Sequence, residues 1–131
     1  MKELDLKVII AGGRDFSDYD LLCKTCDILL AGRNVIEIVS GTARGADSLG
    51  ERYAKEKGIN IKKFPADWNK WGKSSGYRRN AEMARYGNLL IAFHDGISRG
   101  TKNMIEISRE KKLEVHVVKY KKKIIDSSNE G

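Results

Sequence analysis

Residues 35–64 read VIEIVSGTARGADSLGERYAKEKGINIKKF and contain the pattern of a strand, a helix and a second strand. The apolar run 35–39 is rich in β-branched residues, which favour strands. A helical pattern follows from about residue 46 to residue 57, and Gly58 stands where a left-handed residue usually ends a helix. The alternating run 59–64 is the second strand. The unit predicts two parallel strands joined by a crossover helix.

The same alternation of strand and helix continues on both sides of this unit. Further strands are expected at residues 7–11, 89–93 and 114–118, and further helices at 18–31, with Asp18 as the N-cap, at 78–86 and at 101–112. Nearly continuous apolar strands separated by helices indicate a parallel sheet covered on both faces. We therefore predict a single three-layer α/β domain over residues 1–120, with about five parallel strands, followed by a polar, basic tail at 121–131.

One segment does not fit the alternation. Residues 67–76 contain Trp68, Trp71 and two glycines, and they form the longest stretch without a regular pattern. A long aromatic connection of this kind is suited to closing over a bound base, although the tryptophans could equally pack only within the segment. We interpret it as an irregular, mobile lid.

The composition is that of an ordinary globular protein, with 131 residues, 40% hydrophobic and 33% charged. No apolar run is long enough to cross a bilayer or to form a signal peptide, so a cytoplasmic protein without membrane contact is expected. The formal net charge of +7 is concentrated partly in a basic run at 119–123, which makes nucleic acid a weaker expectation than a small ligand. Cys23 and Cys26 fall within a predicted helix and are interpreted as core residues, and no metal or cofactor is expected.

Glycine and arginine recur together in three loops, AGGRD at 11–15, SGTARGAD at 40–47 and SRGT at 98–101. The first two follow strands, and the third leads into the last helix. Ligands of open parallel sheets bind at the carboxyl ends of strands, where glycine admits close approach and helix N-termini attract anions. The loops therefore predict one shared site for a phosphate group, on which the guanidinium groups of Arg14, Arg44, Arg79 and Arg99 converge.

Two common nucleotide motifs are excluded. A phosphate-binding Walker loop requires Gly, four residues and then Gly-Lys-Ser/Thr, but Asp67 stands where the first glycine would precede Gly72 and Lys73. The dinucleotide fingerprint requires Gly-x-Gly-x-x-Gly after the first strand and an acidic residue at the end of the second. Here the first loop contains Gly12-Gly13-Arg14, and the second strand ends in Ser40.

The motif SGTARGAD at 40–47, together with RNAEM at 79–83 and SRGTKNMI at 98–105, resembles the SLOG superfamily. That group includes LOG-type nucleotide phosphoribohydrolases, the core of DNA processing protein A and small YspA/YpsA-related proteins, and the resemblance is to this last, small branch. It covers about residues 7–118. It implies a Rossmann-like sheet in the order 3-2-1-4-5, with the ligand over the first, second and fourth strands.

The loops and the resemblance together define a set of expected ligand-binding residues. These are Gly12, Gly13, Arg14, Ser40, Gly41, Thr42, Ala43, Arg44, Gly45, Asp47, Asp67, Trp68, Arg79, Asn80, Asp95, Ser98, Arg99, Gly100 and Thr101.

The resemblance does not extend to the catalytic glutamate of LOG enzymes. Alignment on Gly100-Thr101 places Met104 at that position, and Glu106 lies about 200° further around the helix, by the roughly 100° per residue of an α-helix. Asp47, Asp67 and Asp95 remain candidate acids, although Asp47 could instead cap a helix and Asp95 could shape a turn. We therefore expect binding rather than turnover.

Three functions stay open. The first is recognition or sequestration of a nucleotide-derived molecule, such as an ADP-ribose-like or cyclic ADP-ribose-like signal in bacterial or phage defence. The second is hydrolysis of a nucleotide N-glycosidic bond. The third is binding of single-stranded nucleic acid. By analogy with related domains, a homo-oligomer is expected.

Overall fold

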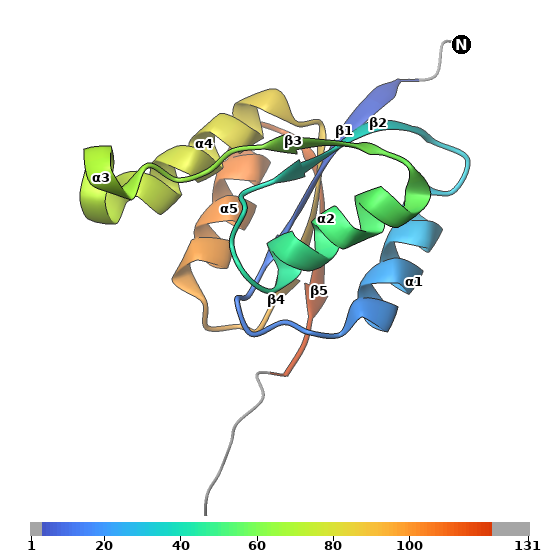
Figure 1. Ribbon diagram of the computed structural model, residues 1–131, viewed down its shortest axis with the longest axis horizontal. Helices are drawn as coiled ribbons and strands as arrows, with labels where there is room; N and C mark the ends of the chain where they lie inside the picture. Colours follow the sequence, from blue (N-terminus) through green and yellow to red (C-terminus); the bar gives the residue numbers. More distant parts are fainter. Residues whose placement is uncertain (1–3, 122–131) are drawn as a thin grey trace, which may run out of the picture.

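The computed structural model describes residues 4–121 and contains one sheet of five parallel strands in the order β3-β2-β1-β4-β5 (Figure 1). The strands are β1 (Asp5–Gly12), β2 (Asn34–Ser40), β3 (Asn60–Lys63), β4 (Leu89–His94) and β5 (Glu114–Lys119). The Rossmann-like α/β fold and the strand order expected from the sequence are confirmed.

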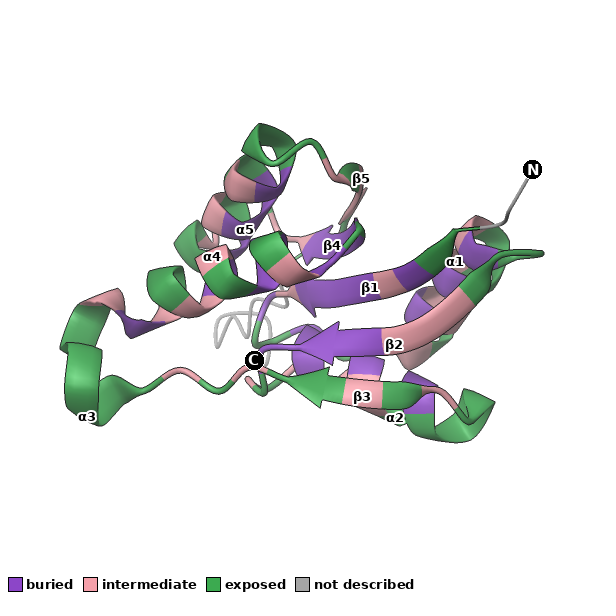
Figure 2. Cartoon of the chain, turned by 90° about the horizontal axis from the view of Figure 1, so that it is seen from above, coloured by how far each residue is buried: buried purple, intermediate pink, exposed green. Residues whose placement is uncertain are grey.

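Helices cover both faces of this sheet. The long ones are α1 (Tyr19–Leu30), α2 (Ala46–Lys57), α4 (Ser75–Tyr86) and α5 (Arg99–Glu110), and two short turns, α3 (Trp68–Trp71) and η1 (Gly72–Ser74), precede α4. Figures 1 and 2 show α1 and α2 on one side of the sheet and α4 and α5 on the other. Three layers result, as the sequence predicted.

Alternate side chains of β1 supply the two cores. Val8 and Ile10 pack into the core beneath α1 and α2. Ile9 and Ala11 pack into the second core, beneath α4 and α5. Successive side chains of a strand point to opposite faces, so a central strand with helices on both sides must be apolar throughout. Figure 2 shows this burial in β1, whereas the edge strand β3 is largely exposed.

Local signals in the sequence mark helix ends correctly. The Asp18 carboxylate accepts a hydrogen bond from the Leu21 amide at 3.0 Å and caps α1. Gly58 adopts φ +69° and ends α2 in the left-handed conformation. Cys26 is buried and Cys23 half-buried in the core face of α1, as expected.

The expectation of an irregular segment at 67–76 is wrong. Asp67 caps α3 by accepting a hydrogen bond from the Lys70 amide at 3.0 Å. The Ser75 hydroxyl lies within hydrogen-bond distance of the Asp67 and Gly72 carbonyl oxygens, at 2.8 and 2.7 Å. These bonds fold residues 67–75 into two consecutive helical turns, here called the α3 arm, which projects from one end of the molecule (Figure 1).

The basic tail predicted at 121–131 lies outside the described residues from position 122 onward. No helix within residues 4–121 has the length and apolar character needed to cross a membrane.

Candidate functional site

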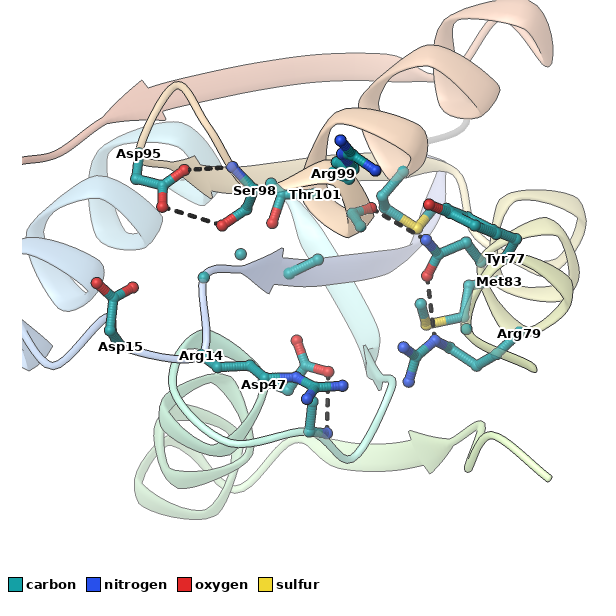
Figure 3. Close-up of a pocket in the computed structure, with 18 of the residues that line it drawn as sticks. Arg14, Asp15, Asp47, Tyr77, Arg79, Met83, Asp95, Ser98, Arg99 and Thr101 are labelled. Atoms are coloured by element: carbon teal, nitrogen blue, oxygen red, sulfur yellow. Dashed lines mark hydrogen bonds between the residues drawn. The ribbon is translucent and has the colours of Figure 1, made fainter. Parts of the chain in front are cut away.

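A cavity of about 460 Å³ opens at the carboxyl ends of β1 and β4 (Figure 3). Its walls come from the loop after β1, the start of α2, the arm and first turns of α4, and the loop that leads from β4 into α5. A smaller cavity of about 240 Å³ adjoins it, because Arg14, Ala43, Trp68 and Arg79 line both. Most of the expected ligand residues meet here.

The predicted residues divide into three groups. Those lining the larger cavity are Gly12, Gly13, Arg14, Ala43, Asp47, Trp68, Arg79, Asn80, Asp95, Ser98, Arg99, Gly100 and Thr101. Those lining only the smaller one are Gly41, Thr42 and Arg44, so the predicted convergence holds for Arg14, Arg79 and Arg99, whereas Arg44 is exposed at the adjoining cavity. Neither cavity is lined by Ser40, Gly45 or Asp67.

Several lining residues were not in the predicted set. In the larger cavity these are Ala11, Asp15, Lys73, Gly76, Tyr77, Met83 and Met104. Met83 falls in the RNAEM motif, and Lys73, Gly76 and Tyr77 lie within six residues before it, so the motif with its N-terminal flank would have found these four. Asp15 ends the AGGRD loop, and its side chain is held by Tyr120, whose hydroxyl donates to the Asp15 carboxylate at 2.6 Å.

Gly45 lets the first two loops touch. It adopts φ +74° as the N-cap of α2, and a Cβ atom there would lie 2.2 Å from the Gly13 carbonyl oxygen. The same oxygen accepts a hydrogen bond from the Ala46 amide at 3.2 Å. Gly45 therefore lets the loop after β1 pack closely against the start of α2, but it does not itself line the cavity.

Ser40 also has a supporting position. Its hydroxyl donates to the Glu51 carboxylate at 2.6 Å and accepts from the Thr42 amide at 3.1 Å. Thr42 has φ +64°, a conformation that a β-branched residue rarely adopts. The bonds to Ser40 thus hold a strained turn beside the smaller cavity.

The start of α5 presents backbone amides to the larger cavity. Ser98 is the N-cap, yet no side chain caps the helix, because the Ser98 hydroxyl donates to Asp95 at 3.0 Å. The first-turn amides, which belong to Arg99, Gly100 and Thr101, therefore have no side-chain acceptor, and such a helix start attracts anions. Figure 3 shows Ser98, Arg99 and Thr101 along one wall.

Asp95 shapes this turn. Its carboxylate accepts from the amides of Ile97 and Ser98 at 2.8 and 2.7 Å. Desolvation raises the pKa of Asp95, but hydrogen bonds from Ser98 and Ile97 outweigh it, and the net pKa is lowered. An ionised carboxylate with these bonds is a poor general acid, so the turn-forming interpretation of Asp95 fits better.

Asp47 lies on the opposite wall, in the first turn of α2. It is 5% exposed, and its Oδ2 atom accepts from the Ala43 amide at 3.1 Å. Burial raises the pKa of this carboxyl to about 6, although the Ala43 hydrogen bond and the charges of Arg79 and Arg14 act in the other direction. Glu51 nearby raises it further.

Arg79 and Asn80 connect the walls. The Nη1 atom of Arg79 donates to the Gly41 carbonyl oxygen, and its Nε atom donates to the Asn80 side chain at 3.1 Å. Asn80 in turn donates to the Gly100 carbonyl oxygen at 3.1 Å and to the Asn103 side chain at 3.0 Å. The pair therefore ties α4 to the loop after β2 and to the start of α5, and Asn80 is largely occupied by these contacts.

The position aligned with the LOG glutamate lies at the cavity. Met104 is 1% exposed and lines it from the second turn of α5. The Glu106 side chain is exposed and does not line the cavity; its Oε1 atom lies 3.9 Å from the Lys102 Nζ atom. The separation of Glu106 from residue 104 around the helix, which the sequence led us to expect, is therefore observed. Within residues 4–121, no cluster of three His, Cys, Asp or Glu side chains is placed to hold a metal ion.

Three comparisons relate the chain to known proteins. Residues 6–71 match the model of a family described as the YspA, cpYpsA-related SLOG family. The chain is 36% identical over 107 residues to the Gene 61 protein of Mycobacterium phage D29, covering 74% of this chain and 83% of that protein. Its fold resembles that of DNA processing protein A from Helicobacter pylori, with a TM-score of 0.63, 21% identity, and coverage of 95% of this chain and 70% of that one. The description of that structure concerns a single-stranded DNA binding mode of the Helicobacter pylori protein.

Proposed function

Because the chain belongs to the YspA, cpYpsA-related SLOG family, we propose that its larger cavity binds a phosphate-bearing small molecule derived from a nucleotide. The observation that carries the proposal is the start of α5, where Arg99 and backbone amides without a side-chain cap face the cavity. A helix start and a guanidinium are the two protein groups best suited to a phosphate.

The rest of the cavity suits the remainder of a nucleotide. A volume of about 460 Å³ falls within the range of small-ligand sites. Trp68 and Tyr77 stand at its rim with 52% and 47% of their surfaces exposed, so either ring is free to stack on a base. Arg14 and Arg79 add positive charge between the two cavities.

Binding without turnover is the form of this function that the residues favour. Met104 cannot exchange a proton, and Asp95 is held ionised by its hydrogen bonds. Recognition or sequestration of an ADP-ribose-like or cyclic ADP-ribose-like signal remains the finer version of the proposal. Its cytoplasmic setting and a homo-oligomeric state likewise remain predictions from the sequence.

The direct test is mass spectrometry of the small molecules released when the purified protein is denatured, followed by calorimetric titration of the compounds found. We expect a phosphorylated nucleotide derivative that binds again with 1:1 stoichiometry. Arg99→Ala should weaken this binding about 10- to 100-fold, which corresponds to a charge-assisted hydrogen bond of about 1.5–3 kcal/mol. Unchanged affinity in this variant would contradict the proposed phosphate position.

A second candidate is binding of single-stranded nucleic acid. The α3 arm and the start of α4 carry Lys70, Lys73, Arg78 and Arg79, with no acidic residue between positions 68 and 81. Cationic groups among exposed aromatic rings are the usual means of holding a single strand. Oligonucleotide affinity that falls steeply with salt would support this candidate, whereas no binding at moderate salt would remove it.

A further inference from the structure

One oxygen of a buried carboxyl group is open to the cavity. The Oδ2 atom of Asp47 accepts from the Ala43 amide, while Oδ1 has no hydrogen-bond partner within the described residues. Oδ1 is not sealed in the interior either, because across residues 4–121 the Ser108 hydroxyl is the one fully buried side-chain polar atom without a partner. Asp47 lines the larger cavity, so this oxygen faces the ligand space.

The surroundings of Asp47 restrict what this oxygen can bind. An ionised carboxylate only accepts hydrogen bonds, so its partner must be a donor. The positive charges of Arg14 and Arg79 already act on Asp47, and a third cation would be repelled by them. A phosphate would be repelled by the carboxylate itself. The remaining partner is a neutral donor, either a hydroxyl or an uncharged N–H group.

The geometry of the cavity indicates which neutral donor this is. Asp47 and the start of α5 lie on opposite walls, with the end of β1 between them (Figure 3). A nucleotide whose phosphate rests on the amides of Arg99 and Gly100 extends its sugar away from that wall. The ring hydroxyls of the sugar are the first neutral donors along such a ligand.

We propose that Asp47 is a specificity-determining residue whose open oxygen accepts hydrogen bonds from the vicinal hydroxyls of a ribose. The inference rests on the proposed function and adds that the site selects ribonucleotides over deoxyribonucleotides. A deoxyribose that lacks one of the two hydroxyls leaves the buried carboxylate partly unpaired, which is costly. DNA, which has no vicinal hydroxyl pair, is therefore the disfavoured occupant of this cavity.

The test compares matched ligands. The ribonucleoside 5′-mono- and diphosphates of the common bases and their 2′-deoxy counterparts are titrated into the native protein by calorimetry near neutral pH. We expect at least one ribonucleotide to bind about 10- to 100-fold more tightly than its deoxy counterpart, the worth of one charge-assisted hydrogen bond. Asp47→Ala should bring that ratio to about one.

Two further variants separate this role from a structural one. Asp47→Asn keeps an acceptor for the Ala43 amide but no charge, so it should fold and show a much reduced ratio. Arg99→Ala should weaken both members of a pair equally and keep the ratio. A ratio near one in the native protein, or a native ratio kept in both Asp47 variants, would overturn this inference alone. No binding of any tested nucleotide would overturn the proposed function with it.

Discussion

The guanidinium of Arg79 donates a hydrogen bond to the carbonyl oxygen of Gly41, and this contact fixes α4 against the loop after β2. A Cβ atom on Gly41 would lie 2.6 Å from the Arg79 Nη1 atom and 2.8 Å from the Asp47 Oδ2 atom. Glycine at this position therefore lets the arginine and the buried carboxyl approach the same backbone segment. The smaller cavity is bounded by this contact, since Gly41 and Arg79 both line it.

Replacing Arg79 by alanine should weaken nucleotide binding about 10- to 100-fold, because the cavity loses a cation and the tie that positions the loop. The measurement is calorimetric titration of the ligand released from the native protein. Arg78→Ala is the matched control: the Arg78 guanidinium stacks on Trp71 at 3.8 Å and lines neither cavity. Equal losses of ligand affinity in the two variants would mean that binding depends only on the total positive charge and not on the position of Arg79.

Gly45→Ala should destabilise the fold strongly. Its positive φ disfavours any side chain, and the new Cβ would meet the Gly13 carbonyl oxygen at 2.2 Å. Gly32→Ala provides the control, since Gly32 has φ +71° but nothing within 4 Å. We expect a loss of about 1 kcal/mol in the free energy of unfolding for Gly32→Ala and at least about 2 kcal/mol for Gly45→Ala, measured by urea denaturation. Similar losses of unfolding free energy in the two variants would show that the loops around Gly13 and Gly45 move apart without a further loss of stability.

The sequence predicted the sheet because its signals are local. The apolar strands, the cap at Asp18 and the left-handed Gly58 each depend on neighbouring residues. The arm was missed because its turns are held by a serine that bonds back to carbonyl oxygens three and eight residues away. Four-residue helices leave too little periodicity to be detected.

The roles of individual site residues were harder to predict for a related reason. Ser40 and Asn80 were expected to contact ligand, but their polar groups bond to Glu51 and to Gly100. Partners 11 and 20 residues apart are set by how the helices pack, which no local pattern encodes. Asp67 was likewise expected to contact ligand, but it caps α3 and lines neither cavity.

The α3 arm should gain protection when ligand binds. Trp68 lines both cavities and is half exposed, so a base stacked on it would slow local opening. Hydrogen exchange of residues 68–75 should therefore slow with ligand in the native protein but much less in Trp68→Ala. Trp71→Ala serves as the control because Trp71 lines neither cavity. Equal protection with and without ligand would count against closure of the arm.

With methionine at position 104, the protein should bind nucleotides without cleaving them. Native protein incubated with nucleoside monophosphates should release no free base at an enzymatic rate, as followed by chromatography. Met104→Glu places a carboxyl at the cavity and should restore a trace of activity in the same assay, since general acid–base catalysis contributes roughly 10²–10⁴-fold. Native turnover of about one per second or faster would show that another acid performs the reaction.

Burial of Asp47 destabilises the folded protein at neutral pH. Its pKa of about 6 lies above the value of roughly 3.9 expected in the unfolded chain. A raised folded-state pKa means that the native state holds the proton more tightly. The associated stability is fully present below about pH 4 and is lost as the pH rises through about 6.

Asp47→Asn removes this dependence while keeping an acceptor for the Ala43 amide. The charged groups that act on Asp47, namely Arg14, Arg79 and Glu51, are unchanged in the variant. At neutral pH the variant should therefore be more stable than the native protein by about 3 kcal/mol, from roughly 1.4 kcal/mol for each of about two pKa units, and the gap should close near pH 4.

Urea denaturation of both proteins without ligand, at several pH values between about 4 and 8, measures this difference. A gap that grows with pH, together with weaker ribonucleotide binding in the variant, would show that the native protein keeps a destabilising carboxylate for recognition. Parallel stability curves for the two proteins would contradict the raised pKa, because then Asp47 would ionise equally easily in the folded and unfolded chains.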